Sequence, residues 1–299
     1  MSYSLKTAAV ATSSSETAML DFLHYGFMQR ALLSSVIVGT TCSFMGVFVV
    51  LRGMAFAGSG LAHAAFGGVA LGFLLAINPL FAAVLFCLGT AGLIQVVSRK
   101  AQLRMDAAIG VFFAFAMALG VLFIGLMRRY DARVYGYLFG NVLGVTAGNL
   151  TLMAALGLVV VGVIALLYRQ FKFLTFDEEM AEASGLPTGA LAALLLLLLA
   201  LTVVVSLKAV GIILVEALLV TPAATAYQLT NRYGMMFVLS WVSGVVSCVI
   251  GLVVSYALGI PSGAAIVIVA TALFALAMLF SPKRRKCKVC GHESSVDMG

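Results

Sequence analysis

Long stretches without a charged residue constrain this chain more than any other feature. A membrane-spanning helix needs about 20 predominantly apolar residues, and a soluble fold needs a charged exterior. Only 10% of the 299 residues are charged and 63% are hydrophobic. This balance excludes a soluble enzyme, a disordered protein and a nucleic-acid-binding domain. The uncharged stretches cover residues 31–51, 53–98, 107–127, 134–168, 183–207 and 233–282.

The uncharged stretches predict an all-α polytopic membrane protein with a bundle of eight or nine transmembrane helices. The longest ones are divided by turn signals at Asn78-Pro79 and at Gly259-Ile260-Pro261. Glycine or proline interrupts the candidate spans 54–76 and 209–229, so a count of eight stays open. The nine candidate spans are 31–51, 54–76, 80–98, 107–127, 147–168, 189–207, 209–229, 234–257 and 262–280.

The basic residues predict the topology. With Arg52 placed in the cytoplasm and nine spans, 12 of the 18 Lys and Arg residues fall on the cytoplasmic side, as the positive-inside rule expects. The N-terminus then lies outside and the C-terminus inside. We expect an extracytoplasmic tail at 1–26, a transmembrane domain at 27–281 and a basic cytoplasmic tail at 282–299.

Two ionisable side chains fall inside predicted spans. His63 follows Ser59 by four residues, so the two share one helix face. Glu216 precedes Pro222, which removes a backbone hydrogen bond and kinks the span. Such groups are costly in a membrane and mark translocation paths. His63 is either a metal or substrate contact or a core histidine with a local hydrogen bond. Glu216 is either a cation ligand or proton carrier or a structural carboxylate.

The segment 175–187 predicts a short helix outside the membrane. Thr175 and Glu178 have the spacing of a capping box, and Gly185 with Pro187 predicts the helix end. The helix, expected over residues 176–184, is either a solvated loop helix or a docking helix for a cytoplasmic partner. Its candidate docking residues are Thr175, Asp177, Glu178, Glu179, Glu182 and Gly185.

The C-terminal tail carries Cys287, Cys290 and His292, spaced like one knuckle of a zinc ribbon. A structural zinc site needs four ligands, and the tail supplies at most three. The alternatives are a regulatory metal site, completed across a dimer, and a basic tail with two free thiols at the anionic membrane surface.

The chain also resembles the membrane permeases of zinc, manganese and iron(II) ABC importers. The resemblance covers about residues 27–280. The matching stretches are Phe27–Leu32, Gly46–Met54, Gly58–Gly72, Asp106–Gly110, Tyr137–Asn141, Thr175–Pro187, Val210–Ala226 and Pro261–Ala265.

The resemblance implies a homodimeric permease in the cytoplasmic membrane of a prokaryote, embedded in lipid. It further implies two separate ATP-binding cassette subunits on the cytoplasmic face, with the 175–187 segment as the coupling helix. An extracytoplasmic metal-binding protein is expected to deliver a divalent metal, and no permanently bound cofactor is expected. The chain has no GxxxxGK[ST] motif, so it carries no P-loop and is not expected to hydrolyse ATP itself.

One departure from the family concerns the metal path. The family usually has Asp four residues before the histidine at the position of His63, and the pair is thought to contact the metal. Here Ser59 stands at that position, whereas Glu216 stands where the family commonly has a small or apolar residue. We hypothesise that Glu216 supplies the missing anionic ligand, which requires Glu216 and His63 to lie close together.

Two other functions are compatible with the same residues. An ion-coupled secondary transporter or channel for a cation would need no ATPase. An intramembrane hydrolase would use Ser59 and His63, but the sequence offers no oxyanion-hole loop and no third group to orient the histidine.

Overall fold

The protein is an all-helical bundle. The computed structural model describes residues 26–101, 103–127, 136–137, 140 and 146–281. The helices are α2 (Gly26–Leu51), α3 (Ala55–Leu74), α4 (Pro79–Lys100), α5 (Met105–Leu126), α7 (Ala147–Leu166), α8 (Tyr168–Phe176), α9 (Glu178–Ala183), α10 (Thr188–Val210), α11 (Ile212–Leu229), α12 (Tyr233–Leu258) and α13 (Ser262–Leu279).

The predicted fold class is confirmed. Among the described residues, eight helices are long and apolar enough to cross a membrane, and α11 is a shorter apolar helix with an apolar part at Leu214–Leu229. The protein is therefore a multi-pass membrane protein. The eight long helices are α2, α3, α4, α5, α7, α10, α12 and α13.

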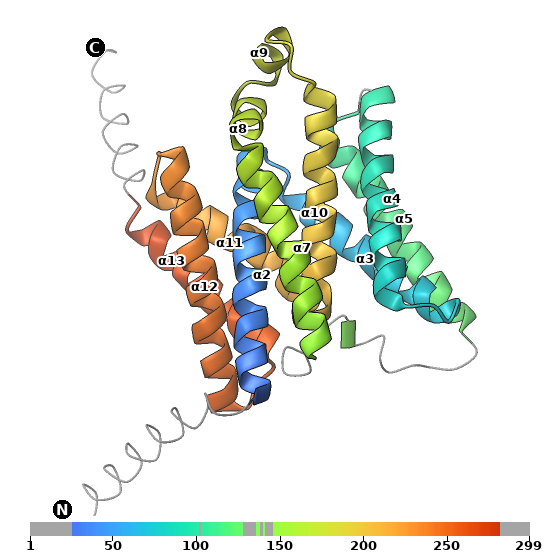
Figure 1. Ribbon diagram of the computed structural model, residues 1–299, viewed down its shortest axis with the longest axis vertical. Coiled ribbons are helices and arrows are strands. Elements are labelled where there is room, and N and C mark those ends of the chain that lie inside the picture. Colours follow the sequence, from blue (N-terminus) through green and yellow to red (C-terminus); the bar gives the residue numbers. More distant parts are fainter. Residues whose placement is uncertain (1–25, 102, 128–135, 138–139, 141–145, 282–299) are drawn as a thin grey trace, which may run out of the picture.

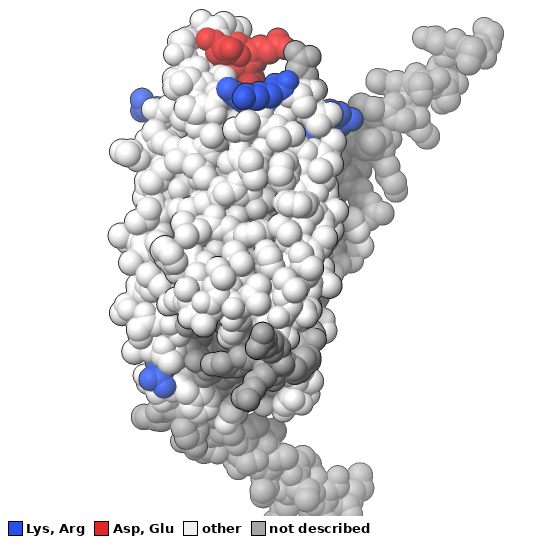
Figure 2. All heavy atoms as spheres, turned by 90° about the vertical axis from the view of Figure 1, so that its right-hand side faces the viewer, with Lys and Arg blue, Asp and Glu red and all other residues white. Residues whose placement is uncertain are grey.

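The two ends of the bundle differ in charge. The eight long helices and α11 together run in alternate directions along the chain, so the segments after α2, α4, α7 and α11 reach the end that carries α9 (Figure 1). Basic side chains gather at this end next to the acidic ones (Figure 2). The basic residues in these segments and in the last turn of α4 are Arg52, Arg99, Lys100, Arg104, Arg169, Lys172 and Arg232.

Local signals set most helix boundaries. The Asn78 side chain accepts a hydrogen bond from the Leu80 amide at 3.0 Å, with Pro79 at the first helical position of α4. This is a good N-cap, because the proline lacks only an amide that would have no helical partner. Gly259 ends α12 in the left-handed conformation, with φ of +64°. Both predicted turns are confirmed.

Two predicted boundaries are wrong for one physical reason. The prediction starts the first span at residue 31, but α2 already includes residues 26–30, and the break expected at Lys208 lies instead at Gly211. A single charged residue interrupts an apolar run without breaking a helix. Gly211 has φ of +78°, a conformation that only glycine adopts freely, so the helix direction changes there.

The helix α2 is at the centre of the bundle and packs against α7, α11 and α12. Gly46 of α2 meets the backbone carbonyl of Leu219 in α11, and a methyl group at position 46 would overlap that oxygen. Gly58 of α3 likewise receives the Leu219 side chain. These glycines let α11 approach both α2 and α3 closely.

Candidate functional site

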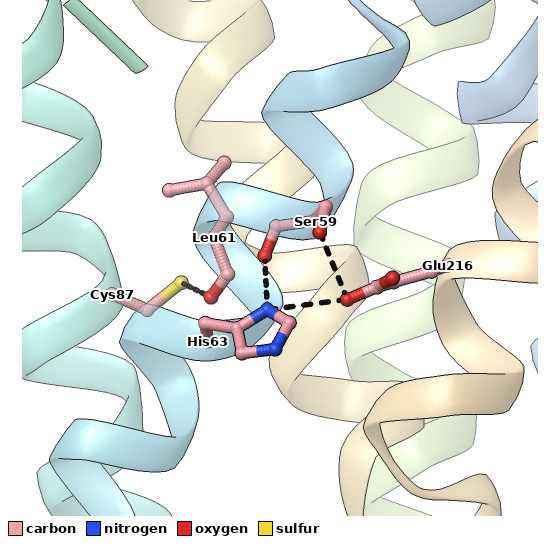
Figure 3. Close-up of polar contacts among 5 residues, drawn as sticks. All are labelled: Ser59, Leu61, His63, Cys87 and Glu216. Atoms are coloured by element: carbon pink, nitrogen blue, oxygen red, sulfur yellow. Dashed lines mark hydrogen bonds and ion pairs between the residues drawn. The ribbon is translucent and has the colours of Figure 1, made fainter. Parts of the chain in front are cut away.

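Ser59, His63 and Glu216 converge on one point between α3 and α11 (Figure 3). The Ser59 hydroxyl donates to Glu216 Oε1 at 3.1 Å. His63 Nδ1 lies 3.2 Å from the same carboxylate oxygen and 2.9 Å from the Ser59 backbone carbonyl oxygen. The expected face shared by Ser59 and His63 is present, and Glu216 reaches it from a helix 157 positions along the chain from Ser59.

The close packing of α11 brings the carboxylate to this point. Glu216 lies three residues before Leu219, which contacts Gly46 and Gly58. Small residues on α2 and α3 therefore fix the height and distance of α11, and through it the position of the carboxylate. Glu216 has to reach Ser59 from a separate helix, so the contact depends on this packing and not on sequence spacing.

The site is lined by aromatic side chains and is partly open. The Phe113 ring of α5 contacts the His63 ring edge to face, with centroids 4.7 Å apart, and Phe56 packs on Phe113 at 5.8 Å. The His63 and Glu216 side chains are 23% and 31% exposed. Both contacts of His63 use Nδ1, so Nε2 on the far side of the ring takes part in neither of them.

The donors are one imidazole, one carboxylate and one hydroxyl. Carboxylate and hydroxyl oxygens suit hard divalent ions such as Mn²⁺, and imidazole suits Zn²⁺ and Fe²⁺. No group of three His, Cys, Asp or Glu side chains is gathered for a metal within the described ranges. One copy of the chain thus offers two strong ligands and a hydroxyl, fewer than the four to six positions that these ions fill.

The membrane-spanning cysteines do not join the site. Cys87 donates from its thiol to the Leu61 carbonyl at 3.4 Å, next to the site on α3 (Figure 3). Cys42 lies 3.5 Å from the Ser206 hydroxyl. Cys42, Cys87 and Cys248 are all free and buried, as expected for small packing residues.

The predicted extramembrane helix is present, but the predicted start is wrong. Thr175 does not cap it, because Thr175 lies in α8 and donates from its hydroxyl to the Phe171 carbonyl at 2.7 Å. Asp177 is the N-cap of α9, accepting from the Met180 amide at 2.8 Å. The preceding chain already forms helix α8, so the capping residue comes two positions later than the capping-box spacing suggests.

The end of α9 follows the prediction. Gly185 has φ of +81°, and its amide donates to the Glu182 carbonyl at 2.9 Å. Glu178 and Glu179 lie in the first turn of α9. Their negative charges stabilise the helix there, because the N-terminal end of the helix dipole is positive. The acidic residues of this helix form the red cap at one end of the bundle in Figure 2.

An ion pair that the sequence does not reveal links α9 to the transmembrane helices. Arg52 Nη2 lies 2.7 Å from Glu178 Oε2. Arg52 follows directly after α2 and lies two residues before Met54, the N-cap of α3. Its side chain is only 12% exposed, whereas Glu178 is 48% exposed. The sequence assigns Arg52 only a role in topology, because nothing in it pairs this side chain with a residue 126 positions away.

The C-terminal tail carries the other predicted metal ligands. Cys287, Cys290 and His292 lie outside the described residues, as does most of the N-terminal tail.

The chain is similar to membrane proteins of manganese transport systems. The manganese transport system membrane protein MntC of Halalkalibacterium halodurans is 42% identical over 264 residues, covering 88% of this chain and 90% of that protein. The manganese import system permease protein ScaB of Streptococcus parasanguinis is 35% identical over 273 residues, covering 91% and 97%.

A solved structure agrees with the fold. PsaBC from Streptococcus pneumoniae, determined in complex with Fab, superposes with a TM-score of 0.82 at 33% identity, covering 91% of this chain and 99% of that chain. Residues 24–281 match the sequence profile of the ABC 3 transport family. The chain therefore belongs to the ABC 3 transport family and is a membrane permease of that family.

Proposed function

We propose that this chain is the permease subunit of an ATP-driven importer for divalent manganese, in the cytoplasmic membrane of a prokaryote. The observation that carries the proposal is the convergence of Ser59, His63 and Glu216 on one partly open point within the bundle. The relatives named manganese permeases support manganese over zinc or iron(II). An oxygen-rich donor set with one imidazole is consistent with that preference.

In this proposal Glu216 carries out the role of the Asp that Ser59 replaces. Its Oε1 lies within 3.2 Å of both the Ser59 hydroxyl and His63 Nδ1, so a cation displacing these contacts would meet all three side chains together. The negative charge offsets the loss of hydration by the cation. Because the site is partly open, water or a second copy of the chain can fill the remaining coordination positions.

The proposed ATP coupling runs through α9. The acidic helix lies at one end of the bundle (Figure 1), and Met180 at its centre is 56% exposed. An exposed apolar side chain ringed by acids suits a protein partner, here a separate ATP-binding cassette subunit. We assign this end to the cytoplasm from the basic residues that gather there. A homodimer and an extracytoplasmic metal-binding protein complete the proposed assembly.

Uptake by the reconstituted assembly tests the proposal. The permease, its cognate ATPase and binding protein are placed in liposomes, and Mn²⁺, Zn²⁺ and Fe²⁺ are offered in turn. We expect ATP-dependent Mn²⁺ uptake that His63→Ala and Glu216→Gln abolish. Asp106→Asn, the same carboxylate-to-amide change in the first turn of α5, should leave uptake intact. Uptake without ATP would favour the ion-coupled transporter instead, and equal uptake by all four proteins would overturn the proposed site.

A further inference from the structure

A lateral groove lies between α7 and α12, away from the Ser59–His63–Glu216 site. It has a volume of about 300 Å³ and is open on one side. Phe44 of α2 forms its floor, Ile164 and Ala165 of α7 and Phe237 of α12 form its walls, and Tyr168 of α8 stands at one end. α7 and α12 each pack on α2, and the groove remains between them.

The groove faces the membrane. α7 and α12 form the front of the bundle in Figure 1, whereas α3 and α11, which carry the metal-site residues, lie behind. α7 also exposes Leu158 at 77% and Leu166 at 81%. Apolar side chains this exposed, within a helix that crosses the membrane, have lipid as their solvent. The hydrocarbon that surrounds the helices is thus available to fill the groove.

Positive charge gathers at the α8 end of the groove. Lys172 Nζ lies 5.6 Å from the centre of the Tyr233 ring, and that ring lies 5.5 Å from Tyr168 and 5.2 Å from Phe237. The Lys172 ammonium group therefore contacts the Tyr233 ring, which in turn contacts the groove residues Tyr168 and Phe237. Arg169 and Arg232 are exposed and adjoin Tyr168 and Tyr233 in the chain.

The helix α8 has the pattern of an interfacial helix. It buries Phe171 and Leu174 and exposes Arg169 and Lys172. Such a helix lies at the boundary between acyl chains and head groups, with its basic face toward anionic lipid. The groove residues Phe44, Ile164 and Phe237 then lie at acyl-chain depth, on the membrane side of the end that carries Lys172.

From this arrangement we propose that the groove binds one anionic phospholipid, with an acyl chain between α7 and α12 and its phosphate beside Lys172, Arg169 and Arg232. The groove supplies apolar contact area and the three basic side chains supply charge complementarity. The inference needs only the membrane position of the bundle. With the orientation proposed above, the lipid belongs to the cytoplasmic leaflet, where anionic lipids attract basic segments.

The chain contains a reporter for this site. Trp241 is its only tryptophan, and its indole Nε1–H donates to the Thr40 hydroxyl at 3.0 Å. Trp241 lies one helical turn beyond Phe237, and Thr40 lies one turn before Phe44, so the indole is next to the groove. It is 41% exposed, which leaves it open to quenching by a neighbouring lipid.

Fluorescence quenching by brominated lipids tests the proposal on the full chain. The protein is placed in phosphatidylcholine vesicles that contain increasing fractions of acyl-brominated phosphatidylglycerol or of acyl-brominated phosphatidylcholine. We expect half-maximal quenching of Trp241 at a lower mole fraction of the phosphatidylglycerol. Each basic side chain contributes about fivefold to this preference, so Lys172→Gln should reduce it by about that factor. The triple change Arg169→Gln, Lys172→Gln and Arg232→Gln should remove it.

Two further variants separate the groove from general attraction to an anionic surface. Lys100→Gln with Arg104→Gln removes two charges at the same end of the bundle but beside α4 and α5, and it should keep the preference. Ala165→Phe fills the groove and should weaken quenching by both lipids. Equal quenching by the two lipids in the wild type would overturn the proposal. Loss of the preference in the control pair, or quenching by neither lipid because a second copy covers Trp241, would overturn it as well.

Discussion

The contact between Gly46 and α11 predicts a large effect from a single methyl group. Gly46→Ala places a Cβ against the Leu219 carbonyl oxygen. That oxygen belongs to the backbone of a helix, so it cannot rotate away as a flexible side chain could. To restore ordinary contact beyond 3.4 Å, α2 and α11 have to separate along their whole contact. Glu216 lies one turn from Leu219 and has to move with α11.

The magnitude follows from a matched pair of variants. Gly92 of α4 has no atom within 4 Å of the point that an added methyl group would occupy, so Gly92→Ala changes only helix propensity, a gain of about 1 kcal/mol. Gly46→Ala has the same gain but adds overpacking, which costs about 1–3 kcal/mol. Gly46→Ala should therefore be less stable than Gly92→Ala by that amount. Since ligand positioning governs metal affinity, its Mn²⁺ affinity should fall by about 10–100-fold.

The assay compares both variants and the wild type in detergent micelles. Chemical unfolding gives the difference in stability, and equilibrium Mn²⁺ binding gives the affinity. If Gly46→Ala matched Gly92→Ala in both measurements, the packing of α2 against α11 would not position Glu216, and the reasoning would be refuted.

Other contacts support three more predictions. Ser59→Asp adds a second carboxylate beside Glu216 Oε1, so it should raise the Mn²⁺ affinity several-fold. Without metal the two carboxylates repel each other, so the thermal stability should fall. Calorimetry with and without Mn²⁺ checks both effects, and an unchanged affinity would count against a ligand at position 59. Asp177→Ala removes the N-cap of α9 and should destabilise that helix by about 1 kcal/mol. This should be seen as weaker ATPase binding by titration, whereas Asp177→Asn, which keeps a capping side chain, should keep most of the helix stability. A double-mutant cycle of Arg52→Gln and Glu178→Gln should give a coupling energy of about 1 kcal/mol, since Glu178 is half exposed, and additive effects would mean that the ion pair does not hold α9.

Much of the fold could be predicted from local signals. Apolar runs locate the membrane spans, and Asn78-Pro79 and Gly259 end their helices by backbone chemistry that acts within a few residues. The charged residues Arg30 and Lys208 mislead the prediction, because a helix tolerates one charge near its end. Gly211, with its positive φ, is the true break.

The candidate site was predictable only in part. His63 and Glu216 stand out because ionisable side chains are costly within a membrane, and their predicted proximity is met at 3.2 Å. Phe113 and the Arg52–Glu178 ion pair carry no such signal, because one is an ordinary apolar residue and the other joins helices distant in the chain. Contacts of this kind arise from tertiary packing, which spacing along one helix does not reveal.

Metal binding at Glu216 is the claim on which the functional account depends most directly. Electron paramagnetic resonance measures it, because the signal of free Mn²⁺ falls as the ion is bound by the purified permease. The account predicts saturable binding by the wild type, at least about tenfold weaker binding by His63→Ala and by Glu216→Gln, and wild-type binding by Asp106→Asn. Equal binding by the wild type and Glu216→Gln would contradict it.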